Sequence, residues 1–168
     1  MFISVVFSFR NEEKTIPELV RRVVDVLQGI GQYELIFVND ASTDSSLKAL
    51  EHLRTENKNI KIINTSRRFG VTPCVIAGLS EAKGDAVIYM DADLQDPPEL
   101  IPELIKKWQG GAEVVHTVRK KRHGENIIKM LLTSLAYKSI NAFSDIDFYE
   151  NVGDFKLLSR RAVSEVLK

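Results

Sequence analysis

The sequence contains one cysteine, Cys74, so it cannot form a disulfide within the chain. Cys74 lies in an apolar segment with helical spacing, and we interpret it as a small buried side chain. The 23 basic and 23 acidic residues give a formal net charge of zero, which disfavours a nucleic-acid binder that depends on a basic surface. No apolar run reaches the roughly 18 residues of a membrane-spanning helix, and the N-terminus lacks the basic region of a signal peptide. We therefore expect a soluble, cytosolic chain.

Common nucleotide-binding and nucleophile motifs are absent as well. The chain has neither a GxGxxG turn nor a GxxxxGK[ST] phosphate loop. His52, His116 and His123 lack metal-ligand spacing, and no serine lies in a nucleophile elbow. The remaining candidates for site chemistry are carboxylates.

What the chain does contain is typical of one globular domain: 168 residues, 44% hydrophobic and 27% charged. A chain of this length buries roughly 70% of its unfolded surface. No internal repeat or linker-like stretch divides it, so we expect a single domain over residues 1–168. The last predicted helix still continues at Lys168 without a capping residue, and we expect the sequence to be part of a longer protein.

Short β-rich runs alternate with segments of helical period along the chain. Strands are predicted at residues 3–9, 34–38, 60–64, 86–90, 113–118 and 155–158. Helices are predicted at residues 14–28, after a capping Asp44, and at residues 72–83, 98–108, 126–143 and 159–167. This alternation predicts an α/β fold with a mostly parallel sheet covered by helices on both faces.

Polar and acidic residues follow several of the predicted strands. In chain order these are Asn11-Glu12-Glu13, Asn39-Asp40, and Asp91 with Asp93. Ligands of parallel sheets bind outside the carboxyl ends of the strands. Because these residues share that edge, we expect them to form a single site.

The stretch AVIYMDADLQDPPE at residues 86–99 is the most informative of the chain. An apolar strand ends in Asp91 and Asp93, with only Ala92 between them. Two carboxylates on one edge repel each other unless a cation lies between them, and oxygen ligands suit Mg²⁺ or Mn²⁺. We expect a divalent cation here, at a place where a diphosphate could be bound.

Four segments resemble the successive motifs of family-2 inverting glycosyltransferases: VVFSFRNEE, VNDASTD, GDAVIYMDADLQDPPE and VGDFKLLSRR. The resemblance covers nearly the whole chain. DADLQDPPE and ENVGDFKLLSRR are most similar to the polyprenyl-phosphate branch, which includes bactoprenol glucosyltransferases and dolichol-phosphate mannose synthases. The resemblance implies a GT-A fold, a nucleotide-diphospho-sugar donor, Mg²⁺ or Mn²⁺, and a polyprenyl phosphate acceptor at the cytosolic face of a membrane. The family's usual transmembrane helices are missing from this sequence, no nucleic acid is implied, and an oligomer is compatible with it.

The resemblance also implies roles for individual residues on the donor side. Asp93 would ligate the metal, and Asp91 would lie near the ribose and metal. Asp40 would contact the nucleobase, with residues 7–13 forming the rest of that pocket. The implied donor-binding residues are Phe7, Phe9, Asn11, Glu13, Asp40, Asp91 and Ala92.

On the acceptor side, the resemblance places Gln95 beside the sugar or the acceptor phosphate. Arg119 and Arg122 match arginines that the family places on phosphates. Asp154 matches the acidic residue that would act as a base or as an acceptor-side group, and with Asp93 and Gln95 it completes the implied catalytic set.

The sequence departs from the family pattern in two places. Asp40-Ala41-Ser42 stands where the pattern has Asp-Gly-Ser, which puts in question any turn that needs the positive φ of glycine. Ser8-Phe9-Arg10-Asn11 stands where the pattern has Pro-x-Tyr/Phe-Asn. The base of the donor is therefore left open.

The chemistry can also be argued without the family. Sugar transfer develops oxocarbenium character while negative charge grows on the departing diphosphate, and a cation held by Asp93 would stabilise that charge. A phosphate acceptor is already ionised near neutral pH, so Asp154 would orient it, and the basic run at residues 119–123 would surround it. Among possible donors, UDP-glucose is the one that the resemblance to bactoprenol glucosyltransferases favours.

Other interpretations of the same residues remain open. Asp40 could be a turn residue, Asp154 could be structural, and the basic run could be an exposed loop. The acceptor could instead be a glycan hydroxyl, in which case Asp154 would have to act as a base. The chain could also be a fragment that binds the donor without turnover. A receiver-like signalling module is disfavoured, because nothing acidic follows the strand at residues 60–64.

Overall fold

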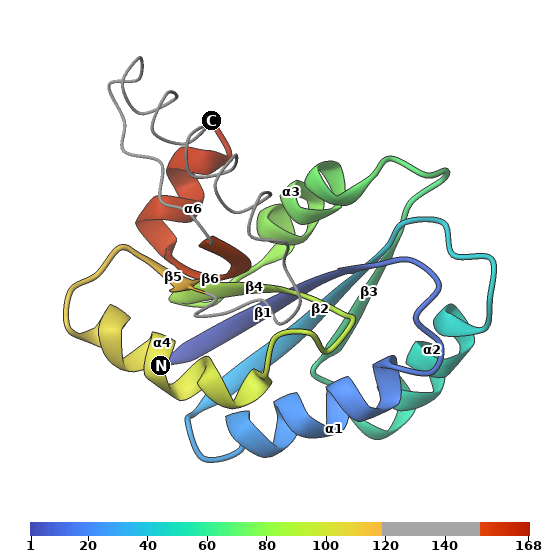
Figure 1. Ribbon diagram of the computed structural model, residues 1–168, viewed down its shortest axis with the longest axis horizontal. Coiled ribbons are helices and arrows are strands. Elements are labelled where there is room, and N and C mark those ends of the chain that lie inside the picture. Colours follow the sequence, from blue (N-terminus) through green and yellow to red (C-terminus); the bar gives the residue numbers. More distant parts are fainter. Residues whose placement is uncertain (119–151) are drawn as a thin grey trace, which may run out of the picture. The chain divides into compact units, whose positions relative to one another are not determined.

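The computed structural model describes residues 1–118 and 152–168 (Figure 1). The chain divides into two compact units: Met1–Val115 with Asp154–Lys168, and His116–Gly153. Most of the second unit lies outside the described residues, and with it the predicted helix at residues 126–143 and the basic run at residues 119–123. The candidate site belongs to the first unit.

Strands and helices alternate as the sequence predicts. The described strands are β1 (Phe2–Phe9), β2 (Gln32–Asn39), β3 (Ile60–Asn64), β4 (Ala86–Asp91), β5 (Val114–Val118) and β6 (Val152–Ser159). The described helices are α1 (Ile16–Leu27), α2 (Ser46–Glu56), α3 (Val71–Glu81), α4 (Ile101–Gln109) and α6 (Arg160–Val166), with a 3-10 turn η1 (Pro98–Leu100) before α4.

The strands form one sheet in the order β3-β2-β1-β4-β6-β5. β1 pairs in parallel with both β2 and β4, and β2 pairs in parallel with β3. β6 runs antiparallel to β4. The predicted mostly parallel sheet is thus confirmed, and the carboxyl ends of β1, β2 and β4 meet at one edge, as expected from the polar residues that follow them.

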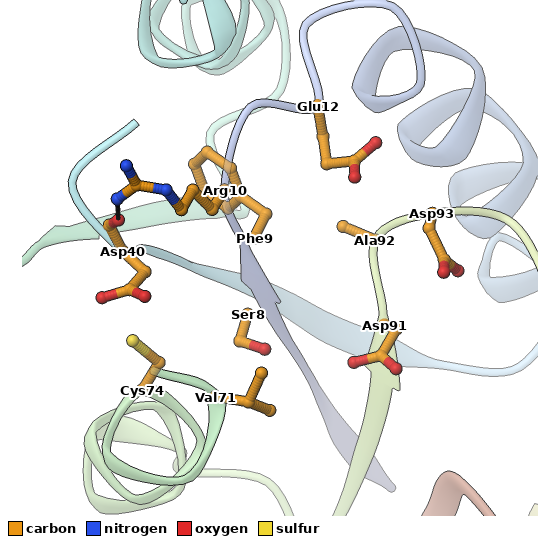
Figure 2. Close-up of a pocket in the computed structure, with 10 residues that line it drawn as sticks. All are labelled: Ser8, Phe9, Arg10, Glu12, Asp40, Val71, Cys74, Asp91, Ala92 and Asp93. Carbon is orange, nitrogen blue, oxygen red and sulfur yellow. Dashed lines mark hydrogen bonds between the residues drawn. The ribbon is translucent and has the colours of Figure 1, made fainter. Parts of the chain in front are cut away.

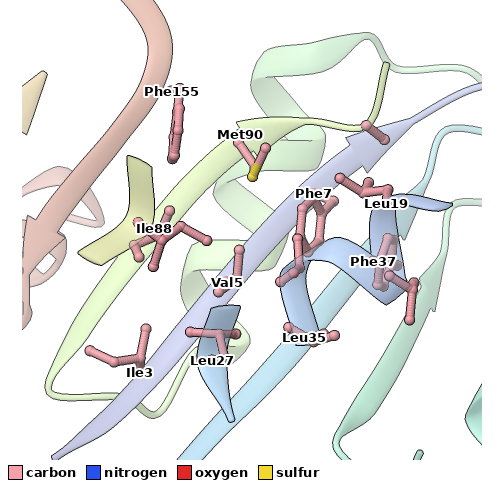
Figure 3. Packing of buried hydrophobic residues seen from close by; sticks show 14 of the residues in the cluster. Ile3, Val5, Phe7, Leu19, Leu27, Leu35, Phe37, Ile88, Met90 and Phe155 are labelled. Carbon is pink, nitrogen blue, oxygen red and sulfur yellow. The ribbon is translucent and has the colours of Figure 1, made fainter. Parts of the chain in front are cut away.

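Two hydrophobic clusters lie on opposite faces of the sheet. Successive side chains of a strand point to opposite faces, and β1 shows this clearly. Val5 and Phe7 pack in the cluster that includes residues of α1, α2 and α4, whereas Val6 packs with residues of α3 and α6. Phe7 stacks on Phe37 of β2, with ring centroids 4.5 Å apart (Figure 3). Cys74 is buried in the second cluster, as predicted.

A buried carboxylate, Glu34, lies at the opposite edge of the sheet from the polar strand ends. It accepts hydrogen bonds from Ser4 Oγ at 2.6 Å and from the backbone N–H of Lys83 at 2.7 Å, and Lys61 Nζ lies 2.5 Å from its second oxygen. Burial raises the pKa of Glu34, but the bonds from Lys61, Ser4 and Lys83 outweigh it and lower the pKa. Because its oxygens are taken up by the chain itself, we assign Glu34 a role in holding this edge together.

Candidate active site

A cavity of about 190 Å³ opens at the carboxyl edge of the sheet, where β1, β2 and β4 end. Its residues come from the three strand ends and from the start of α3, and Figure 2 shows Asp40 on one side and Asp91 with Asp93 on the other. The lining residues are Ser8, Phe9, Arg10, Glu12, Asp40, Val71, Cys74, Asp91, Ala92 and Asp93.

Asp40 is buried at the end of β2, with only 6% of its surface exposed. Its two carboxylate oxygens accept the backbone N–H groups of Phe69, at 2.7 Å, and Gly70, at 3.0 Å. Burial raises the pKa of Asp40, but these two bonds, the thiol of Cys74 and the charge of Arg10 lower it by more. Asp40 is therefore ionised at neutral pH and ties the end of β2 to the entry of α3.

The loops after β1 and β2 are joined by side-chain hydrogen bonds. Arg10 Nη1 donates to the backbone oxygens of Asp40, at 2.9 Å, and Ala41, at 3.1 Å. The side-chain oxygen of Asn11 accepts the backbone N–H of Thr43 at 2.8 Å, and Glu13 Oε2 accepts that of Ser45 at 2.9 Å. These contacts fix the wall of the cavity before any ligand is bound.

Three residues beside the cavity adopt a left-handed backbone conformation without being glycine. Asn11, Ala41 and Leu94 have φ values of 59°, 50° and 59°, in a region that costs a residue with a Cβ atom roughly 1–2 kcal/mol. The turn at Asp40-Ala41-Ser42, where the family pattern has glycine in the middle, therefore forms with Ala41 at positive φ. The two bonds from Arg10 to this loop help to hold it.

Asp91, at the end of β4, is half-buried and lies in a negatively charged surrounding. Tyr89 donates its hydroxyl to Asp91 Oδ1 at 2.6 Å. Burial raises the pKa of Asp91, the Tyr89 bond lowers it, and the charges of Asp154, Asp93 and Asp96 raise it further, so that the net direction is upward.

Asp154 of β6 lies close enough to Asp91 for its charge to act on it. β4 and β6 pair with Ile88 opposite Leu157 and Tyr89 opposite Lys156, and continuing this antiparallel register by two residues places Asp154 opposite Asp91. Its side chain is 70% exposed, with Lys156 Nζ 4.0 Å from its carboxylate. Asp91 and Asp154, far apart in the sequence, are therefore neighbours at the edge of the sheet.

Comparison with known proteins places the chain in a family. A model of glycosyl transferase family 2 matches residues 4–167. The chain belongs to this family. Among curated proteins it is 42% identical over 165 residues to an uncharacterized glycosyltransferase of Synechocystis, covering 98% of this chain and 52% of the relative. It is 39% identical over 168 residues to a bactoprenol glucosyl transferase of Shigella phage SfV, covering 99% of this chain and 54% of the relative. The chain spans about half the length of these relatives.

The fold of this family-2 chain also matches that of solved glycosyltransferases. The mannosyltransferase of Pyrobaculum calidifontis, solved in complex with GDP-Man and Mn²⁺, superposes with a TM-score of 0.68 at 19% identity. The match covers 98% of this chain and 46% of the mannosyltransferase. The predicted GT-A fold is thereby confirmed. Among the described residues, no helix is both long and apolar enough to cross a bilayer.

Several residues that the resemblance assigns to the donor line the cavity, whereas others do not. Phe9, Asp40, Asp91, Ala92 and Asp93 all line it. Phe7 is fully buried in the core, because it points to the face covered by α1. Asn11 and Glu13 are used in the contacts between the loops after β1 and β2.

The structure describes only some of the residues that the resemblance assigns to the acceptor side. Gln95 is exposed, and its backbone N–H bonds to Asp93 Oδ1 at 3.0 Å. Arg119 and Arg122 lie outside the described residues. Asp44, predicted as a helix cap, lies one residue before the N-cap of α2, which is Ser45. It still accepts from the backbone N–H and the hydroxyl of Ser46 at the start of α2.

The carboxylates at the cavity can supply some, but not all, of the ligands that a divalent cation needs. Among the described residues, no three histidine, cysteine, aspartate or glutamate side chains converge well enough to hold a metal ion by themselves. Mg²⁺ in proteins is commonly bound by one or two carboxylates together with phosphate oxygens of the substrate. Asp91 and Asp93 fit this arrangement, because both line the cavity. Burial is the main cause that raises the pKa of Asp91, and the charges of Asp154, Asp93 and Asp96 add to it; a cation would offset that added negative charge.

Sequence reasoning missed the contribution of Cys74, Val71 and Tyr89 to this site. It placed Arg10 in the pocket segment at residues 7–13 but did not predict its bonds to the loop after β2. Val71 and Cys74 lie in the first turn of α3. The bond from the backbone N–H of Gly70 to Asp40 holds the start of this helix at the cavity. Arg10 stands out in the sequence only as a departure from the family pattern. Tyr89 looks like an ordinary apolar strand residue in the sequence, because its hydroxyl partner Ser8 comes from another strand.

Proposed function

We propose that this family-2 chain transfers a hexose from a nucleotide-diphospho-sugar to a polyprenyl phosphate, with inversion and with a divalent cation. The observation that carries the proposal is the 39% identity, over 99% of this chain, to a protein named bactoprenol glucosyl transferase. The name of that relative favours glucose as the sugar, and we take UDP-glucose as the donor to be tested first. The cavity with Asp40 on one side and Asp91 with Asp93 on the other supports a donor that carries both a base and a diphosphate.

In the proposed reaction, an oxygen of the acceptor phosphate attacks the anomeric carbon from the face opposite the leaving group. The bond from that carbon to the diphosphate oxygen breaks, and the nucleoside diphosphate departs with the electron pair. The acceptor needs no base, since a phosphate monoester with a second pKa of about 6 is already ionised at neutral pH. Asp154, exposed and paired loosely with Lys156, would orient the acceptor rather than deprotonate it.

The residues on the donor side would bind and orient the donor and stabilise the leaving diphosphate. Asp91 and Asp93 would hold Mg²⁺ or Mn²⁺. When bound, such an ion supplies positive charge that stabilises the leaving diphosphate. Asp40 would fix the base end of the donor, because its carboxylate is already ionised and held in place by backbone N–H groups.

The acceptor determines where the protein would act. A polyprenyl chain is held in a bilayer, so transfer to its phosphate would take place at a membrane surface. Nucleotide sugars are cytoplasmic, which favours the inner face. Arg119 and Arg122 would be the phosphate-binding residues in this proposal.

A glycan hydroxyl is the second candidate acceptor, because the exposed Asp154 beside Asp91 could serve as a base. The two candidates differ in what Asp154→Asn does. Loss of a required base typically costs 10²–10⁴-fold in rate, whereas loss of an orienting group on an ionised acceptor should cost less than about tenfold.

The test is an incubation of the protein with labelled UDP-glucose or GDP-mannose, polyprenyl phosphate and Mn²⁺, followed by extraction of the lipid. We expect a lipid-linked sugar from one donor, and none from Asp93→Ala. Asp25→Ala removes an exposed carboxylate of α1 and is the matched control, with unchanged product. No lipid-linked sugar from either donor would contradict the proposal, and donor binding without product would favour the non-transferring fragment.

A further inference from the structure

A chain of hydrogen bonds runs under the floor of the cavity, from β1 to the end of β4. Ser8 Oγ lies 3.2 Å from the hydroxyl of Tyr89, which lies 2.6 Å from Asp91 Oδ1. Ser8 and Asp91 line the cavity, whereas Tyr89 is 3% exposed beneath them. β1 and β4 pair with Ser8 opposite Asp91, and Tyr89 and Asp91 share a face because they are two residues apart on one strand.

The direction of these two hydrogen bonds follows from the protons that the three side chains can donate. A phenol has one proton to donate, and in the bond to the Asp91 carboxylate the Tyr89 hydroxyl is the donor. The proton between Ser8 and Tyr89 must therefore come from Ser8. Bonds to a charged acceptor are short and roughly twice as strong as neutral ones, and the 2.6 Å distance fits that class.

This arrangement restrains Asp91 in a specific way. Oδ1 is engaged by a phenol on a rigid, buried ring, which fixes the orientation of the carboxylate. Among the described residues, the hydrogen bond from Tyr89 is made to Oδ1, and none is made to Oδ2. Packing alone needs only the ring, which phenylalanine would supply equally well.

We propose that Tyr89 is a positioning residue for the donor site, which acts by holding Asp91 through its hydroxyl, with Ser8 as the outer link. The inference rests on the proposed function, because Asp91 is the group that would face the donor and its metal ion. Tyr89 itself touches neither. Outer partners of metal-binding carboxylates typically contribute 10–100-fold to metal affinity or activity, and Tyr89 occupies this position for Asp91.

The experiment compares wild type with Tyr89→Phe, which keeps the ring and removes the hydroxyl. Binding of UDP and of GDP in the presence of Mn²⁺ is measured by calorimetry over a range of Mn²⁺ concentrations, and sugar transfer is measured alongside. We expect a roughly 10–100-fold loss of Mn²⁺-dependent nucleotide affinity, partly restored at high Mn²⁺. Ser8→Ala, which breaks only the outer link, should lose less, about two- to fivefold. Ser8→Ala carries the test alone if Tyr89→Phe does not fold.

Tyr33→Phe is the matched control, because it removes a tyrosine hydroxyl at the start of β2, at the other edge of the sheet, where Asn57 is its partner. It should leave nucleotide affinity unchanged. A Tyr89→Phe protein that is less heat-stable than wild type but binds nucleotide and Mn²⁺ equally well would overturn the inference, since the hydroxyl would then serve the fold alone. Absence of nucleotide binding by wild type would instead overturn the proposed function, and this inference with it.

Discussion

Replacing Asp40 with asparagine should weaken the link between the end of β2 and the entry of α3. The carboxylate accepts one backbone N–H on each oxygen, from Phe69 and from Gly70. Asparagine has a single acceptor oxygen, so its NH₂ group would face one of these donors and leave it unpaired. An unsatisfied buried donor costs about 1–3 kcal/mol, which for a chain of this size lowers the melting temperature by roughly 2–12 °C.

The pH dependence of this effect has a defined sign. The pKa of Asp40 is lowered in the folded protein, so the folded state favours the ionised carboxylate. Its contribution to stability is present above the unfolded pKa of about 3.9 and is lost as the pH falls toward the lower folded value. Asparagine does not titrate. The difference in stability between wild type and Asp40→Asn should therefore shrink between about pH 4 and the acid limit of the native state.

Urea denaturation at pH 7 and at about pH 3.5, below the unfolded pKa, measures how much stability Asp40→Asn loses and how that loss changes with pH. Asp25→Asn, an exposed carboxylate of α1, is the control for a change of charge without buried partners. If Asp40→Asn is as stable as wild type at neutral pH, the two backbone bonds do not hold the entry of α3, and Asp40 does not have this structural role.

Three further substitutions or modifications test the fold around the cavity. Ala41→Gly should raise the free energy of unfolding by about 0.5–1 kcal/mol, because φ is 50° at this residue; a loss of stability in urea denaturation would contradict the strain. Gly78→Ala should destabilise the protein by about 1–3 kcal/mol, because its methyl group would collide with Val6 on β1; a neutral effect in thermal denaturation would refute the close packing. Burial and the charge of Asp40 raise the pKa of the Cys74 thiol to about 11, so a disulfide reagent at neutral pH should react slowly before unfolding and quickly after it. Rapid labelling of the native protein would show that this thiol is accessible.

The position of the site could be predicted from the sequence, because parallel strands bring their carboxyl ends to one edge. Asp40, Asp91 and Asp93 lie at that edge as expected. Phe7 could be excluded from the donor-binding residues only once the strand register was known, because this register turns its side chain toward α1. Periodicity likewise predicted β6 as a strand but not its antiparallel direction, since both directions have the same alternation of side chains.

The partners of the site residues were harder to predict, because they come from distant segments. Asp40 binds backbone N–H groups of the loop before α3, which have no signature in the sequence. Ala41 adopts a conformation that favours glycine, and the two bonds from Arg10 that support the loop depend on the geometry of another strand end. The hydroxyl of Tyr89 reaches Ser8 only because β1 and β4 are neighbours in the sheet.

The cavity at the carboxyl edge should bind the donor through its aspartates and a divalent cation, and this expectation is central to the proposed function. Calorimetric titration of UDP-, GDP- and dTDP-glucose, with and without Mn²⁺, tests it directly in wild type and in Asp93→Ala. We expect one nucleotide to bind much more tightly with Mn²⁺, and the Mn²⁺-dependent part to be lost in Asp93→Ala. Equal binding by both proteins, or no binding of any of the three nucleotides, would contradict a donor site built on these aspartates.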